Sequence, residues 1–118
     1  MTIKLNDRGY QHGKRLIEEG KFVCDQREDW SEHHLSTRLE KEFVEERGFG
    51  EYAKWFLAVD DEYGEDTRPH YEFQHGDFEN AHRCALLAAE SRAHRYKHFA
   101  IEKAATDLLA MIDSQARE

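Results

Sequence analysis

The sequence predicts an α+β fold that is mainly helical, with about four helices, a small antiparallel sheet of two or three strands and a C-terminal helical hairpin. Three observations support this prediction. Apolar residues recur at helical spacing in two C-terminal segments, 78–96 and 101–112. Aromatic residues alternate in 71–74, shortly after an acidic loop and the single proline of the chain. The length of 118 residues, with 39% apolar residues, suits a single domain (1–118) with one modest core.

The first helix is expected over 8–19 and ends at Gly20. Gly9 and Gly13 lie inside this helix and weaken it, since each glycine costs about 1 kcal/mol relative to alanine. Their spacing of four residues suggests either a close approach of another part of the chain or a frayed first turn.

Two short segments follow this helix. Segment 21–24 suits a short strand. The polar run 25–36 has no periodicity, which indicates an irregular connection pinned by a buried Trp30.

A second helix is expected from Thr37, because Thr37 and Glu40 have the spacing of a capping box. Gly48 predicts its end. The apolar side chains of Leu39 and Phe43 are expected to face inward.

Two periods compete in 52–59. One face of a helix would contain Tyr52, Trp55, Phe56 and Val59. One face of a strand would contain Trp55, Leu57 and Val59. We expect a turn of helix followed by a strand. The acidic loop, 60–66, then connects this strand to 71–74 in a hairpin.

The segment around His-Gly-Asp predicts the junction between sheet and helix. Tyr71, Phe73 and His75 are expected to share one face of an extended segment, because strand side chains alternate. Asp77 is expected to cap a helix over 78–96 by accepting hydrogen bonds from its first N–H groups.

That helix is expected to pack against the last one through small side chains. Its apolar stripe consists of Phe78, Ala81, Ala85, Ala88, Ala89 and Tyr96. The facing stripe consists of Ile101, Ala104, Ala105, Leu108, Met111 and Ile112. Together the two stripes predict an antiparallel hairpin.

Composition bears on location and partners. The 25 acidic and 17 basic residues give a net charge of −8, which predicts no binding to nucleic acid or to anionic membranes. The sequence begins with no signal-peptide pattern and contains no run of 18 apolar residues, so a cytoplasmic protein without a membrane span is expected. Cys24 and Cys84 are then expected to be reduced thiols, with packing roles.

The C-terminal part carries an ordered set of features: an aromatic pair, His75-Gly76-Asp77, an alanine-rich helix, Ile101-Glu102-Lys103-Ala104-Ala105 and Leu108-Leu109. This order resembles a family of small uncharacterised bacterial proteins and, more remotely, a segment of tailed-phage head proteins. The resemblance covers about a third of the chain tightly. It implies a shared fold and a mobile-element ancestry, and it carries over no catalytic residue.

Eight histidines raise the hypothesis of a metal site. The candidates His70, His75, Asp77 and His82 lie near the junction of strand and helix, where zinc or another divalent metal could bind. Cys84 diverges from His82 by about 200 degrees around a helix, which argues against a shared ion. His94 and His98 are one helical turn apart but straddle the expected helix end. We therefore expect surface and capping histidines and no cofactor.

Two other sites are considered and set aside. The acidic loop lacks the pattern of a calcium-binding loop, because Tyr63 and Asp66 occupy positions that need an oxygen ligand and glycine when Asp61 is position 1. Acid–base pairs such as His75 with Asp77, or Glu32 with His33, would need tertiary contacts to converge.

Three functions are weighed. The leading one is a non-enzymatic module that binds another protein or self-associates through an aromatic surface formed by Trp30, Tyr52, Trp55, Tyr71 and Phe73. The alternative is a metal-dependent or acid–base hydrolytic enzyme with its site around His70, His75, Asp77 and His82. A third, an assembly factor of a phage-like system, follows from the resemblance alone.

Overall fold

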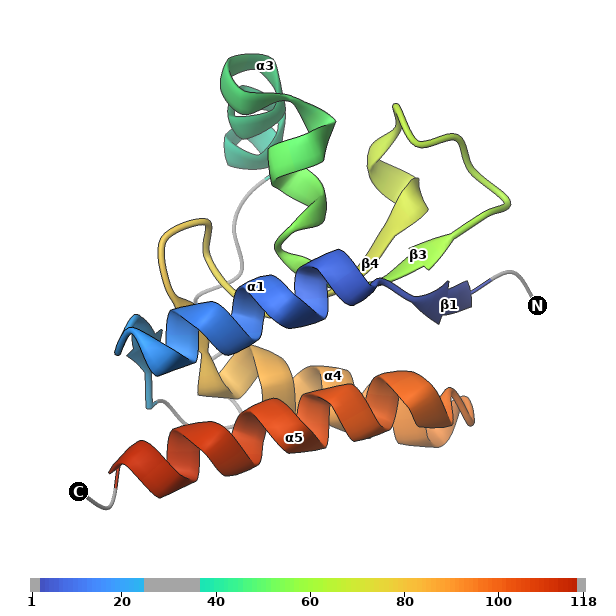
Figure 1. Cartoon of the computed structure of the whole chain (residues 1–118). Helices are drawn as coiled ribbons and strands as arrows, with labels where there is room; N and C mark the ends of the chain where they lie inside the picture. The colour runs from blue at the N-terminus through green and yellow to red at the C-terminus, as the bar shows by residue number, and fades with distance from the viewer. Residues whose placement is uncertain (1–2, 25–36, 117–118) are drawn as a thin grey trace.

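The computed structural model describes residues 3–24 and 37–116 as helices packed around a three-stranded antiparallel sheet (Figure 1). The sheet has the order β1-β3-β4, formed by Ile3–Leu5, Phe56–Asp60 and Tyr71–Gln74. A separate pair of parallel strands joins β2 (Phe22–Val23) to β5 (Ala81–His82). The predicted α+β, mainly helical fold is confirmed. The polar run 25–36, including Trp30, lies outside the described residues.

Helix α1 (Asp7–Glu18) lies against β3 at very short range. A Cβ at Gly9 would lie 1.7 Å from the carbonyl oxygen of Phe56, and one at Gly13 would lie 3.1 Å from a methyl carbon of Leu108. The two glycines therefore allow other parts of the chain to pack closely on α1, which confirms one of the two alternatives predicted from their spacing. Gly20, with φ +79°, follows the end of the helix, where glycine has no steric penalty.

Helix α3 (Thr37–Ala53) consists of two helical segments joined at a kink. Gly48 has φ 83° and ψ 168°, which ends the first segment, and helical turns then resume up to Ala53. The helix end predicted at Gly48 is therefore confirmed, and a second helical segment follows it. Leu39, expected inside, is 48% exposed, whereas Phe43 is half-buried and stacks on Phe78 with ring centroids 4.3 Å apart.

The predicted hairpin between 52–59 and 71–74 is confirmed. The chain leaves the last turn of α3 and enters β3, which pairs antiparallel with β4 in the register Phe56↔Gln74, Ala58↔Glu72 and Val59↔Tyr71. The acidic loop and a short 3-10 helix, η2 (Arg68–His70), connect the two strands. Within the described residues, β4 is thus an edge strand of this sheet.

The expected common face of Tyr71, Phe73 and His75 is not formed. Phe73 has φ +62°, which breaks the alternation of strand side chains. Tyr71 packs on α3, where its ring stacks 5.9 Å from that of Phe49. Phe73 contacts Arg92 of α4, and His75 lies 6.4 Å from His12 of α1 between ring centroids.

Helix α4 (Arg83–Arg95) begins five residues later than the sequence predicts. Its start is delayed because Ala81 and His82 pair with β2, with the Ala81 N–H donating to the Lys21 carbonyl at 3.0 Å. Asp77 consequently does not cap this helix. Its carboxylate instead accepts hydrogen bonds from the N–H groups of Glu79 and Asn80 within a turn.

Helices α4 and α5 (Phe99–Ala116) form the predicted antiparallel hairpin (Figure 1). Buried residues of α4, among them Ala85, Ala89 and Ala93, face Ile101, Ala105, Leu108 and Ile112 in one hydrophobic core. Three members of the predicted stripes differ: Phe78 and Ala81 precede the helix, and Tyr96 is 54% exposed. None of the helices in the described parts of the chain is long and apolar enough to cross a membrane.

Candidate functional site

The four residues proposed as a metal or acid–base site do not converge. Asp77 and His82 form a pair, with Oδ2 and Nε2 2.8 Å apart. His70 lies beside the acidic loop, where Nδ1 is 2.9 Å from the Asp60 carbonyl oxygen. His75 is fully buried against α1. Within 3–24 and 37–116, no group of three or more His, Cys, Asp or Glu side chains could hold a metal ion.

The remaining candidates for chemistry are dispersed. His94 bonds to Glu102, with Nδ1 2.8 Å from Oε2, while the ring of His98 meets the edge of Phe73. Cys24 is exposed and Cys84 is buried in α4. His94 and His98 are thus one helical turn apart in the sequence but contact different residues.

The aromatic residues assigned to an interaction surface lie mostly in the core. Tyr52, Trp55 and Phe73 are 1%, 5% and 6% exposed, and Tyr71 is half-buried. Trp30 lies outside the described residues. The exposed surface on which the interaction hypothesis rested is therefore not formed by Tyr52, Trp55 and Phe73.

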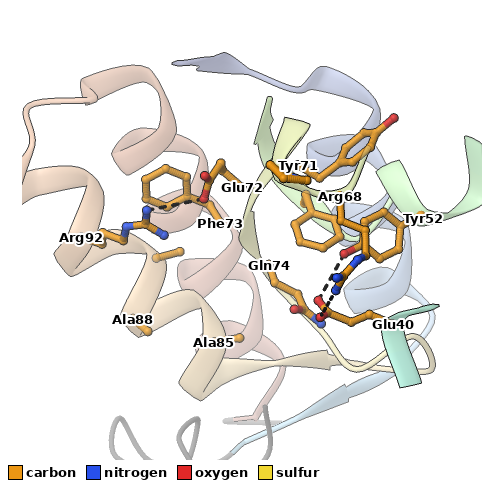
Figure 2. Close-up of a pocket in the computed structure, with 13 residues that line it drawn as sticks. Glu40, Tyr52, Arg68, Tyr71, Glu72, Phe73, Gln74, Ala85, Ala88 and Arg92 are labelled. Atoms are coloured by element: carbon orange, nitrogen blue, oxygen red, sulfur yellow. Dashed lines mark hydrogen bonds and ion pairs between the residues drawn. The ribbon is translucent and has the colours of Figure 1, made fainter. Parts of the chain in front are cut away.

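A cleft of about 500 Å³, hereafter the β4 cleft, opens between α3, β4 and α4 (Figure 2). Strand β4 lines it along its whole length, from Tyr71 to Gln74. Ala85, Ala88 and Ala89 of α4 lie along the cleft, and their small side chains leave its volume open. Its size falls in the range of ligand sites in proteins, roughly 300 to 1,000 Å³.

One end of the β4 cleft is a hydrogen-bonded group of three side chains (Figure 2). The Tyr52 hydroxyl donates a hydrogen bond to the Glu40 carboxylate at 3.2 Å, and a guanidinium nitrogen of Arg68 donates another at 3.3 Å. Burial, together with the nearby Glu40 charge, raises the pKa of Tyr52 far above its ordinary value. The Tyr52 hydroxyl therefore stays protonated and acts as a donor.

The other end carries a second ion pair. Arg92 of α4 lies 3.5 Å from the Glu72 carboxylate between Nη2 and Oε2, and its guanidinium carbon is 4.8 Å from the centroid of Phe73. The Arg92 side chain is 55% exposed. In Figure 2 this pair and the Glu40 group lie on opposite sides of the view, with Gln74 of β4 between them. The β4 cleft thus has a charged group at each end, and its lining also includes Phe56, the alanines of α4 and the polar side chain of Gln74.

Of the four charged residues, the sequence pattern marks only Glu40, and it marks this residue as part of a capping box with Thr37 and not as part of a site. Glu40, Arg68, Glu72 and Arg92 come from α3, η2, β4 and α4 and are at least 4 and up to 52 positions apart. No local motif relates them. The sequence pattern predicts that the alanines of α4 pack against the last helix, whereas Ala88 lines the cleft.

No protein-family model matches the chain, and neither does any curated protein or any solved structure. The resemblance to small bacterial proteins and to a phage head segment therefore stays a prediction.

Proposed function

We propose that the protein is a non-enzymatic peptide-binding module, in which an extended segment of a partner protein lies in the β4 cleft. One observation carries the proposal: an edge strand of the sheet runs along the cleft. Edge strands offer unpaired backbone N–H and C=O groups, and extended peptides bind such edges by adding a strand.

The shape of the cleft supports an extended ligand. Ala85, Ala88 and Ala89 leave space beside β4 for peptide side chains, and Phe56 and Phe73 supply apolar contact area. Burial of apolar surface gives roughly 25 cal/mol per Å², so each apolar side chain of the peptide that the cleft buries would add about 1 to 3 kcal/mol to the hydrogen bonds of the added strand.

The charged ends support selection of the ligand. Arg68 and Arg92 each contact one carboxylate, and a guanidinium has five N–H donors, so donors remain for a carboxylate of the ligand. Glu40 and Glu72 lie beside them and can accept hydrogen bonds from the peptide backbone or from a lysine. We infer a preference for segments with an apolar centre flanked by charged residues.

The hydrolytic alternative keeps one specific observation, the contact between Asp77 and His82 at 2.8 Å. His82 is 6% exposed, and neither residue lines the β4 cleft. This pair is therefore remote from the ligand that the cleft would hold, and the binding function is the better supported of the two.

The test uses peptides selected from a random display library against the wild-type protein. Ala88→Trp fills the cleft from the half-buried face of α4 and is expected to weaken binding of the selected peptides at least about tenfold. Ala110→Trp, on the exposed face of α5, is the matched control and should bind as the wild type does. Selected peptides that bind both variants equally would contradict the proposal, as would a selection that enriches no peptide.

A further inference from the structure

The last turn of α4, the connecting residues and the first turn of α5 (together 92–103) form a basic surface on an acidic protein, in which Arg92 and Lys103 pair with Glu72 and Asp107 outside this range. We call it the hairpin tip. It contains four lysine or arginine residues and one acidic residue, so its net charge is +3 in a chain of net charge −8. Arg95, Lys97 and Lys103 are exposed. Such a separation of charge favours an acidic partner.

The hairpin tip also exposes two aromatic rings. Tyr96 is 54% and Phe99 63% exposed, more than the other large apolar residues of the described chain. Exposed aromatic rings and arginine side chains are enriched at the centres of protein interfaces, whereas lysine is more typical of their rims. An exposed pair of rings beside cations therefore indicates a docking surface.

The tip is held in one conformation by its own backbone. The His98 N–H donates to the Ala93 carbonyl at 2.8 Å, and the Lys97 N–H donates to the His94 carbonyl at 3.2 Å. Lys97 has φ +61°, which closes the turn tightly. A preformed surface loses little conformational entropy when it binds.

A complementary surface lies on the same chain. The acidic loop exposes Asp61, Glu62, Glu65 and Asp66 together with Tyr63, which is 45% exposed. It is also ordered by local bonds, including Thr67 Oγ1 to the Gly64 carbonyl at 2.7 Å. In Figure 1 the acidic loop and the hairpin tip lie at the same end of the molecule, at the right of the view.

We propose that two copies of this chain associate about a two-fold axis, with the hairpin tip of each docked on the acidic loop of the other. Because both surfaces lie at one end of the molecule, a two-fold arrangement forms both contacts at once and closes the assembly as a dimer. The same arrangement disfavours nucleic acid or an anionic membrane as the partner, since the acidic loop would face their phosphates.

Charge reversal tests the dimer by sedimentation velocity over about 1 to 300 μM protein, because the dimer fraction rises with concentration. The tip variant carries Arg95→Glu and Lys97→Glu, and the loop variant carries Glu62→Lys and Glu65→Lys. Each variant alone is expected to dissociate at least about tenfold more readily than the wild type, since the substituted side chains then face charges of their own sign at both contacts. An equimolar mixture of the two should dimerise again, because the introduced glutamates face the introduced lysines at one contact and the other contact keeps its native charges.

Controls separate this interface from general charge effects. Lys14→Glu with Lys41→Glu changes the net charge as the tip variant does, on exposed positions of α1 and α3, and should leave the dimer intact. Phe99→Ala should weaken the dimer without any change of charge. Circular dichroism melting checks that each variant folds.

Three outcomes would overturn the inference. The wild type could stay monomeric throughout the concentration series. The dimer could persist in both reversed variants. The equimolar mixture could remain monomeric although each variant is folded. The β4 cleft is untouched by these substitutions, so the peptide-binding proposal is tested independently.

Discussion

At the residue scale, His75 shows how the fold controls the chemistry of a side chain. It is fully buried, and its Nε2 lies 3.0 Å from both the Gly9 and the Lys54 carbonyl oxygens. Because carbonyls only accept, Nε2 must carry the proton. His75 thereby ties the end of β4 to α1 and to the chain after α3, which is a structural role and not the metal or acid–base role considered from the sequence.

Burial lowers the pKa of His75 from 6.5 to about 4, partly opposed by its bond to Gly9. The unfolded chain therefore binds more protons than the folded chain between these values, and the free energy of unfolding should fall as the pH is lowered from 6.5 to about 4. The loss from this group is at most about 3 kcal/mol. Burial also lowers the pKa of His12, which adds to the same trend.

Urea unfolding of the wild type and of His75→Gln at several pH values in this window measures the effect. Glutamine retains an N–H donor near the two carbonyls but does not titrate, so the variant should lose part of the pH dependence. His94→Gln, at a side chain that is 72% exposed, is the control and should keep it. An unchanged slope in His75→Gln would show that this histidine is not the source.

At the element scale, long-range backbone contacts decide where helices begin and how close they approach. Helix α4 starts at Arg83 and not at 78 because β5 pairs with β2, which the local alanine pattern could not indicate. Helix α1 shows the opposite case. The spacing of its two glycines predicts either a close approach of another part of the chain or a frayed first turn, and the structure has the close approach.

Gly9→Ala should reverse the usual effect of such a substitution. Inside a helix, alanine is normally better than glycine by about 1 kcal/mol. Here its Cβ would lie 1.7 Å from the Phe56 carbonyl oxygen, so α1 must move away from β3. We expect a loss of about 3 kcal/mol or more in the free energy of unfolding.

Gly64→Ala is the matched control, because nothing lies within 4 Å of a Cβ at that position of the acidic loop. Its free energy of unfolding should stay within about 0.5 kcal/mol of the wild type. Urea unfolding of both variants makes the comparison. Equal stabilities for the two would contradict the close packing of α1 on β3.

At the scale of the whole molecule, the α4–α5 hairpin packs on the sheet and forms one side of the β4 cleft. The inner face of α4, through Ala85, Ala89 and Ala93, joins the core, while Ala88 faces the cleft. The same small side chains thus bring two helices together and leave room for a ligand. Because the alanines of α4 have both roles, a short chain can form a packed core and a concave surface together.

Ala105→Leu tests the close packing of the hairpin. Ala105 is completely buried, so the larger side chain overpacks the core, and we expect a loss of about 1 to 3 kcal/mol in the free energy of unfolding. Ala110→Leu, on the exposed face of the same helix, should change it by less than about 0.5 kcal/mol. Thermal melting of the two variants provides the measurement, and a neutral Ala105→Leu would contradict this packing.

The sequence by itself determined the fold class, the hairpin of β3 and β4, and the C-terminal helical pair. Each depends on neighbours in the chain, since periodicity and turn residues act over a few positions. Tertiary structure alone decided the start of α4, the divergent directions of Tyr71, Phe73 and His75, and the assembly of Glu40, Arg68, Glu72 and Arg92 around the β4 cleft. These features depend on contacts between distant segments, and the energy of such contacts exceeds the weak local preferences that a sequence pattern reports.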